Sequence, residues 1–341
     1  MAITVKDVAM RAGVTPTVVS HVLHNKANTV RVSEATAARV RAAAKDMGYR
    51  LNVLARNFRG RQTFMIGVLH GAGFVRPSLT RGSLYFGLLM DGIVDGAFQR
   101  GYSVTLCPKL MGDQPEDAIS DGRFDGLLWY STSPKEENRQ MLQRCADPLV
   151  LIHTPSEEFG GRFSSVTCDN RQGIGLAVQH LVDLGHRKIA FLSQGTCSTA
   201  ESRVRLTAFQ EEMERHGLTT EGGDFIECGH DNTGLNAYLG AGPRHTAIIG
   251  TSDEQAVSAI RAAQEHGISV PEDISIVGFD STPYCLTVKP NLTSVAQPLY
   301  DMGRIAAGLL IDELADSSTP TRAVVLPCGF ERRDSTASPR P

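Results

Sequence analysis

The sequence has few of the features that mark secreted, membrane or metal-binding proteins. Its 7 cysteines are scattered and never form a C-x-x-C pair, which argues against a disulfide framework and against a zinc site. No apolar run approaches the roughly 18 residues of a membrane-spanning helix, and the opening segment MAITVKD is too polar for a signal peptide. We therefore expect a cytoplasmic protein without membrane contact, whose thiols are reduced and mostly buried.

Enzymatic motifs are missing as well. Neither G-x-S-x-G nor H-E-x-x-H occurs, and no cluster of side chains has metal-ligand spacing. The glycines of Gly173-x-Gly175 lie within an expected helix and not in the strand-to-helix turn of a dinucleotide site. We expect no catalytic residues, no metal and no cofactor, and a turnover assay would test this.

Charge is distributed unevenly along the chain. The first sixty residues hold ten basic and three acidic side chains, an excess of seven positive charges, whereas the whole chain of 341 residues carries a net charge of -3. A basic segment joined to an acidic body predicts a module that binds a polyanion. Charge alone equally allows a solvated helical face.

The length predicts two or three domains.

Start signals for three short helices lie in the first fifty residues. Thr4, Thr15 and Ser33 are N-cap residues, and Pro16 suits the first helical position, where its missing N–H costs nothing. The helices are expected at 5–12, 17–24 and 34–47, the first and last ended by Gly13 and Gly48. A tight turn between the first two helices is typical of a helix-turn-helix module.

From about residue 63, apolar strands alternate with amphipathic helices. Strands are expected at 64–69, 102–106, 125–130, 149–152, 188–192, 225–226, 247–249 and 274–277, and helices at 84–100, 171–185, 200–216 and 253–266. Such alternation predicts βαβ units in parallel sheets, here two Rossmann-like lobes. A cleft beyond the carboxyl ends of the strands, between the lobes, is the expected ligand site.

Several motifs make the chain similar to the LacI/GalR family of regulators. They are TVKDVAMRAGVT from Thr4, Val19-Ser20, the segment 48–52, CDN from Cys168, the segment 180–189, R-x-R-x-x-x-F from Arg203, SDE from Ser252 and VGFD from Val277. The resemblance implies an α/β fold with an all-α helix-turn-helix headpiece (1–49), a hinge (50–61) and a periplasmic-binding-protein-like (type I) sensor domain (62–341). Its lobes are expected at about 62–165 with 293–325, and 166–290 with 326–341.

The same resemblance implies a sequence-specific DNA-binding transcriptional regulator. It would be a repressor whose affinity for its operator is controlled by a small-molecule effector, a carbohydrate or a derivative. A homodimer would place two headpieces on a palindromic double-stranded operator. The alternative is a solute-binding sensor protein without specific DNA binding. The basic headpiece and the polar opening segment count against that alternative.

By resemblance, the second helix enters the major groove and the hinge orders in the minor groove. His21 stands where the family commonly has Arg, so the bidentate contact to guanine is lost; the alternative is an exposed side chain that touches phosphate or nothing. Phe58 stands where Leu usually wedges between bases, unless 50–61 is a plain linker with Phe58 packed on the sensor domain. The complete expected set is Thr4, Thr15, Pro16, Thr17, Ser20, His21, Asn52, Ala55, Arg56 and Phe58.

The family's effector positions carry over to residues of both lobes. Arg205 and Asp280 are expected polar anchors, because together they supply donors and acceptors to hydroxyl groups or to the edge of a heterocycle. The alternative for Arg205 is a structural salt bridge. The complete expected set is Tyr85, Phe86, Asp169, Asn170, Arg205, Ser252 and Asp280.

Two further features of this region leave alternatives open. Tyr85 and Phe86 occupy a position where an aromatic ring stacks on the ligand, but ordinary packing within the lobe is the alternative. The loop 70–83 is longer than usual for the family and contains Arg76 and Arg81. Our hypothesis is that it selects a larger or anionic effector, and deletion of 74–80 without a change in ligand preference would contradict this.

Overall fold

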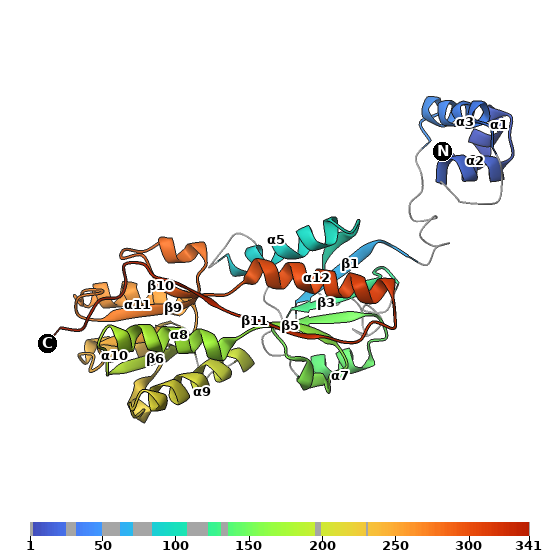
Figure 1. Ribbon diagram of the computed structural model, residues 1–341. Coiled ribbons are helices and arrows are strands. Elements are labelled where there is room, and N and C mark those ends of the chain that lie inside the picture. Colours follow the sequence, from blue (N-terminus) through green and yellow to red (C-terminus); the bar gives the residue numbers. More distant parts are fainter. Residues whose placement is uncertain are drawn as a thin grey trace. The chain divides into compact units, whose positions relative to one another are not determined.

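The computed structural model describes residues 3–24, 32–49, 62–70, 84–107, 122–130, 136–194, 199–229 and 231–340. The chain divides into two compact units between Thr63 and Phe64 (Figure 1). Within the described ranges, no helix is long and apolar enough to cross a membrane.

The N-terminal unit consists of α1 (Val5–Ala12), α2 (Pro16–His24) and α3 (Glu34–Asp46). Thr4 caps α1 in a reciprocal capping box with Asp7, and Ser33 caps α3 through the backbone N–H of Thr36. Gly13 ends α1 in the left-handed conformation, with φ of 65°. The buried side chains Val8, Ala9, Ala12, Val19, Val40, Ala43 and Ala44 form the core. The three predicted helices are therefore confirmed.

The first lobe of the second unit is built on a parallel sheet in the order β11-β5-β4-β3-β1-β2. Its strands are β1 (Met65–His70), β2 (Ser103–Cys107), β3 (Gly126–Tyr130), β4 (Leu149–Ile152), β5 (Ser164–Cys168) and β11 (Ala323–Leu326). Successive side chains of β3 alternate between two apolar clusters, with Leu128 facing α5 (Tyr85–Phe98) and α12 (Leu299–Ala315), and Trp129 facing α7 (Glu136–Arg144). The 3₁₀-helix Ser156–Phe159 follows β4.

Helices α5 and α12 lie side by side over this sheet (Figure 1). Glycine permits their close approach: a Cβ on Gly92 would lie 1.9 Å from the carbonyl oxygen of Tyr300, and one on Gly303 would lie 2.2 Å from that of Leu89. Backbone therefore packs directly on backbone at this crossing.

The second lobe has a sheet in the order β12-β10-β9-β8-β6-β7, parallel except for β12. Its strands are β6 (Ile189–Ser193), β7 (Phe225–Glu227), β8 (Ala247–Gly250), β9 (Ser275–Asp280), β10 (Thr293–Ala296) and β12 (Gly329–Glu331). Its helices are α8 (Asn170–Asp183), α9 (Ala200–Arg215), α10 (Thr233–Gly240) and α11 (Asp253–Glu265), with 3₁₀-helices at Gly222–Asp224 and Pro283–Leu286. Each of the predicted strands is present, with ends within three residues of the prediction.

The chain crosses between the lobes three times: between β5 and α8, between β10 and α12, and between β11 and β12. One expected lobe boundary was wrong, and another lies three residues from its expected place. The first crossing comes after Cys168, because β5 completes the first sheet. The second comes after Ala296, because β10 pairs with β9 in the second sheet and only then does the chain return as α12.

Five cysteines have described side chains, and all five are free and buried: Cys145, Cys168, Cys228, Cys285 and Cys328.

Candidate functional site

The start of α2 is exposed on the surface of the headpiece. Thr15 accepts a hydrogen bond from the N–H of Val18 and so caps the helix, at 3.4 Å. Thr15, Pro16 and Thr17 are exposed, and Ser20 is half-buried. The N–H groups of a helix start favour an anion such as a phosphate, which suits a DNA contact.

The remaining expected DNA-binding residues differ in what the structure says of them. His21 is half-buried on α2, and the exposed Thr4 uses its hydroxyl in the cap of α1. Asn52, Ala55, Arg56 and Phe58 lie outside the described residues, as does the loop 71–83 with Arg76 and Arg81.

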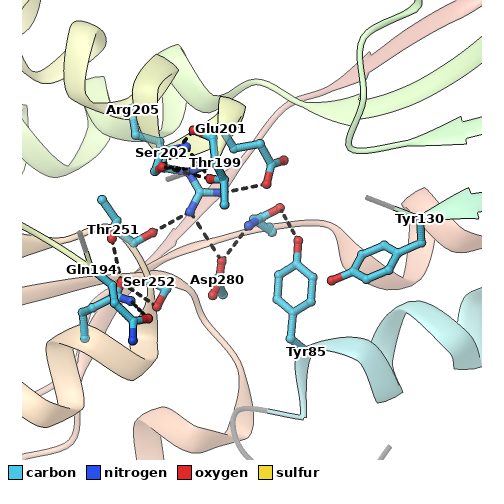
Figure 2. A pocket seen from close by; sticks show the side chains of 12 residues that line it. Tyr85, Tyr130, Gln194, Thr199, Glu201, Ser202, Arg205, Thr251, Ser252 and Asp280 are labelled. Atoms are coloured by element: carbon cyan, nitrogen blue, oxygen red, sulfur yellow. Dashed lines mark hydrogen bonds and ion pairs between the residues drawn. The ribbon is translucent and has the colours of Figure 1, made fainter. Parts of the chain in front are cut away.

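A cavity of about 210 Å³ lies where the two lobes meet. It is lined by Tyr85, Tyr130, Gln194, Thr199, Glu201, Ser202, Arg205, Thr251, Ser252, Gln255, Asp280 and Gln297 (Figure 2). Tyr130 and Asp280 end β3 and β9, and Gln194, Thr251 and Gln297 directly follow β6, β8 and β10. The cavity thus lies at the carboxyl ends of strands from both sheets, where α/β folds bind ligands.

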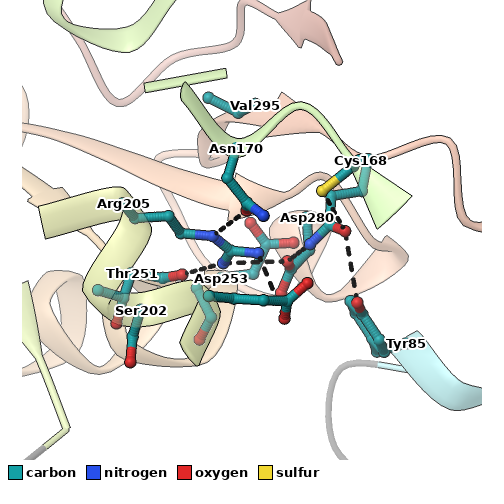
Figure 3. Close-up of polar contacts among 12 residues, drawn as sticks. Tyr85, Cys168, Asn170, Ser202, Arg205, Thr251, Asp253, Asp280 and Val295 are labelled. Atoms are coloured by element: carbon teal, nitrogen blue, oxygen red, sulfur yellow. Dashed lines mark hydrogen bonds and ion pairs between the residues drawn. The ribbon is translucent and has the colours of Figure 1, made fainter. Parts of the chain in front are cut away.

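Arg205 on α9 is the cation of this cleft, and it is held in place from several sides (Figure 3). Its Nε donates to Oδ1 of Asn170 at 2.7 Å, and its Nη1 donates to the carbonyl oxygen of Thr251 at 2.6 Å. The guanidinium lies over the ring of Phe279, 3.7 Å from its centroid. Burial lowers the pKa of Arg205, but the carboxylates of Glu201 and Asp280 outweigh burial and raise it. Arg205 therefore stays charged.

Asp280 faces Arg205 from the end of β9. Its Oδ1 lies 3.9 Å from Nη1 of Arg205 and accepts a hydrogen bond from Nε2 of Gln297 at 2.6 Å. Its backbone has φ of 124°, which is rare for a residue with a side chain. Burial and the nearby carboxylate of Asp253 raise the pKa of Asp280.

A chain of hydrogen bonds links the first lobe to α9 across the cleft. His153, which follows β4, lies 2.9 Å through Nε2 from the hydroxyl of Tyr85 and 2.8 Å through Nδ1 from Oε1 of Glu201. The Tyr85 hydroxyl also donates to Oε1 of Gln297 at 3.4 Å. Burial raises the pKa of Glu201, but His153 and Arg205 reverse this and the net pKa is lowered. Glu201 is therefore a carboxylate at neutral pH.

The expected effector residues divide into three groups. Tyr85, Arg205, Ser252 and Asp280 line the cleft, and Asn170 lies directly behind it as the partner of Arg205. The structure does not bring the other two into the lining.

Phe86 is buried in the first lobe, with its ring centroid 5.3 Å from that of Tyr130, which agrees with the packing alternative. Asp169 caps α8 by accepting the N–H of Gln172 at 2.9 Å. The cap engages one oxygen of the Asp169 carboxylate, and an effector contact by Asp169 stays a prediction.

Sequence reasoning missed much of the lining. The missed residues are Tyr130, Gln194, Thr199, Glu201, Ser202, Thr251, Gln255 and Gln297. A signal was available, since Tyr130, Gln194 and Thr251 stand at or just after strands that the sequence predicted. His153, which holds Glu201 from behind, also directly follows a predicted strand.

Both units of the chain match known protein families. Residues 4–52 match the model of bacterial regulatory proteins of the lacI family, and residues 178–336 match a periplasmic binding protein-like domain. The ribose operon repressor of Escherichia coli K12 is 32% identical over 91% of this chain and 93% of its own length. Among solved structures, a lac repressor dimer bound to operator and the anti-inducer ONPF gives a TM-score of 0.80 at 25% identity, covering 99% of this chain and 100% of its own. A complex of the transcriptional regulator CelR with cellobiose gives 0.71 at 26% identity, covering 98% and 99%.

Proposed function

This chain belongs to the lacI family of bacterial regulatory proteins, and from that premise we propose that it is a repressor that responds to a sugar. It is a DNA-binding regulator controlled by an effector. The observation that carries the proposal is the cleft, in which charged and hydroxyl-bearing side chains of both lobes converge at the carboxyl ends of their strands. A ligand there contacts both lobes at once, and so favours one lobe arrangement over another.

The effector is a carbohydrate, held by Arg205 and Asp280 with Ser252 and Tyr85 around it. Hydroxyl groups donate to carboxylates and accept from guanidinium and amide N–H groups, and the cleft supplies both kinds of partner. The CelR structure, with cellobiose bound, supports this choice of ligand class. These four side chains bind the effector, and we propose that they catalyse no reaction.

The DNA site is the exposed start of α2, with Pro16, Thr17 and His21 toward base edges. Pro16 offers only apolar contact and His21 lacks the fork of an arginine. The hinge 50–61 completes the contact in the minor groove, with Asn52, Ala55, Arg56 and Phe58. Because regulators of the lacI family are bacterial proteins that act on DNA, we place the protein in the cytoplasm.

Two copies bind one palindromic operator. We propose that the second copy binds to the face formed by α5 and β2. This face carries three exposed apolar side chains, Phe98 (78% exposed), Val94 (47%) and Leu106 (38%). Exposed apolar patches of this kind mark association surfaces, and the related lac repressor was solved as a dimer. Sedimentation of the wild type and of Phe98→Glu tests this, with a dimer expected for the first and a monomer for the second.

Effector binding and DNA binding are coupled. The three crossings between the lobes let their relative angle change when the cleft fills, and that change alters the affinity for DNA. The coupling is reciprocal: DNA alters effector affinity by the factor by which effector alters DNA affinity.

The deciding experiment selects an operator from random DNA at fixed salt and repeats the binding measurement with a panel of sugars. We expect a palindromic site whose affinity shifts with one sugar, and the direction of the shift identifies inducer or corepressor. Tight sugar binding with no sequence-specific DNA affinity would instead indicate a solute-binding sensor.

A further inference from the structure

Acidic side chains outnumber basic ones among the described residues that line the cleft. Among the lining residues that the structure describes, Arg205 is the single cation, whereas Glu201 and Asp280 are both acidic. Dashed lines in Figure 2 join the guanidinium to both of these carboxyl groups. The pKa of Tyr130 is raised by burial and then, in decreasing order, by the acidic residues Glu201, Asp280 and Glu254. Glu254 is therefore a third acid close to the cleft.

Part of the hydrogen-bonding capacity of Arg205 is already used within the protein. Its Nε and Nη1 already donate to Asn170 and Thr251. Its Nη2 lies 4.0 Å from Oε2 of Glu201, and its Nη1 lies 3.9 Å from Oδ1 of Asp280. A phosphate in the cleft would compete with two resident carboxyl groups for one guanidinium.

Glu201 keeps its negative charge although it is only 7% exposed. His153 supports Oε1 from the first lobe, Arg205 lies on the other side, and together they lower the pKa of Glu201 against the effect of burial. The carboxylate stands in the first turn of α9, where a helix start favours an anion. It is thus a fixed negative charge in the wall of the cleft.

We propose that Glu201 determines specificity by excluding anionic effectors, so that the effector is an uncharged hydroxyl-bearing molecule and not a sugar phosphate. The inference rests on the proposed function, because it assumes that the effector occupies this cleft. Charges within several ångströms in a partly buried site repel strongly, while hydroxyl groups donate to the same carboxylates without that cost. It also opposes the hypothesis that Arg76 and Arg81 in the loop 70–83 select an anionic effector.

The test is calorimetric titration of the full-length chain with paired ligands. The pairs are ribose with ribose 5-phosphate and glucose with glucose 6-phosphate, and adenine serves as an uncharged compound that is not a sugar. We expect the wild type to bind at least one uncharged sugar about tenfold or more tightly than its phosphate. In Glu201→Gln, which keeps shape and removes charge, that ratio should fall by about tenfold.

The control is Glu211→Gln, which makes the same change on the exposed face of α9, where Glu211 pairs with Arg171. The ratio should stay as in the wild type. If Glu201→Gln fails to fold, a wild-type ratio that favours the phosphate still overturns the proposal.

The other outcomes separate this inference from the proposed function. Preference of the wild type for a phosphate overturns the inference and leaves a sugar-responsive regulator standing. An unchanged ratio in Glu201→Gln also overturns it, because the selectivity then lies elsewhere. Binding of adenine but of no sugar refutes the carbohydrate effector and overturns the inference of a hydroxyl-bearing one, and leaves only the exclusion of anions standing. A panel in which nothing binds contradicts both.

Discussion

The two lobes present different chemistry to the cleft that they share. The second lobe supplies the charged and amide groups, and these are fixed by one another through Arg205, Asp280 and Gln297. The first lobe supplies the phenol rings of Tyr85 and Tyr130, with His153 behind. We infer that the second lobe recognises the effector and that the first lobe closes over it. Substitutions in one lobe at a time can test this difference in role.

The largest expected effect comes from Arg205→Met in the recognising lobe. Removing the guanidinium leaves Glu201 and Asp280 without their cation and deletes the main donor to the ligand. Truncating one member of a buried charged pair costs about 2–5 kcal/mol in binding, so effector affinity should fall at least about thirtyfold. Calorimetry measures this, and Arg203→Met on the exposed side of the same helix is the control. An unchanged affinity would support the purely structural alternative for Arg205.

A somewhat smaller effect, on stability alone, is expected for Gly92→Ala in the first lobe. The new methyl group would lie 1.9 Å from the carbonyl oxygen of Tyr300, so α5 and α12 must separate. Overpacking of this kind costs about 1–3 kcal/mol, to be read from urea unfolding. Gly308→Ala is the matched control on α12, because its Cβ would meet nothing closer than a guanidinium nitrogen of Arg100 at 3.9 Å. Equal stabilities of the two variants would contradict the close packing.

Tyr85→Phe should lower effector affinity only modestly, and this change tests the role of the first lobe. The change removes the hydroxyl that bonds to His153 and Gln297 but keeps the ring. A buried hydrogen bond contributes about 1 kcal/mol, so effector affinity should fall about fivefold while DNA affinity without effector is unchanged. A loss as large as that of Arg205→Met would show that the first lobe shares in recognition.

The smallest effect is expected from pH acting on Glu201. Its folded pKa lies below the ordinary value of 4.5, so its ionised form contributes stability above the unfolded pKa. That contribution is lost as the pH falls through the folded pKa. Urea unfolding of the wild type and of Glu201→Gln between pH 7 and the acid limit measures it. The difference between the two proteins should shrink toward acid pH, and a difference that grows there would show that the sign is wrong.

Local signals made the headpiece predictable. Thr4, Gly13 and Ser33 act within a few residues of their own positions, so caps and stops could be placed from the sequence. The strands β1 to β4 and β6 to β9 were equally visible as short apolar runs, whereas β5, β10, β11 and β12 were not predicted. Arg205 and Asp280 were expected from the family resemblance, and the structure places both in the cleft.

Contacts between distant segments were not predictable. His153 and Glu201 are 48 residues apart and meet only because the two sheets end at the same cleft. The capping role of Asp169 was not predicted either, although its partner Gln172 lies only three residues further along the chain. The strand β10 was assigned to the wrong lobe because its four residues carry no sign of which sheet they join.

The three crossings also have a consequence for biosynthesis. Both sheets receive an edge strand from the end of the chain, β11 at 323–326 in the first and β12 at 329–331 in the second. Neither lobe can therefore be completed until those residues have left the ribosome, although the headpiece sequence emerges first. Incomplete sheets expose unpaired strand edges, which promote aggregation. A ribosome that stalls late in translation would thus release a chain in which both lobes, and not one, remain unfinished.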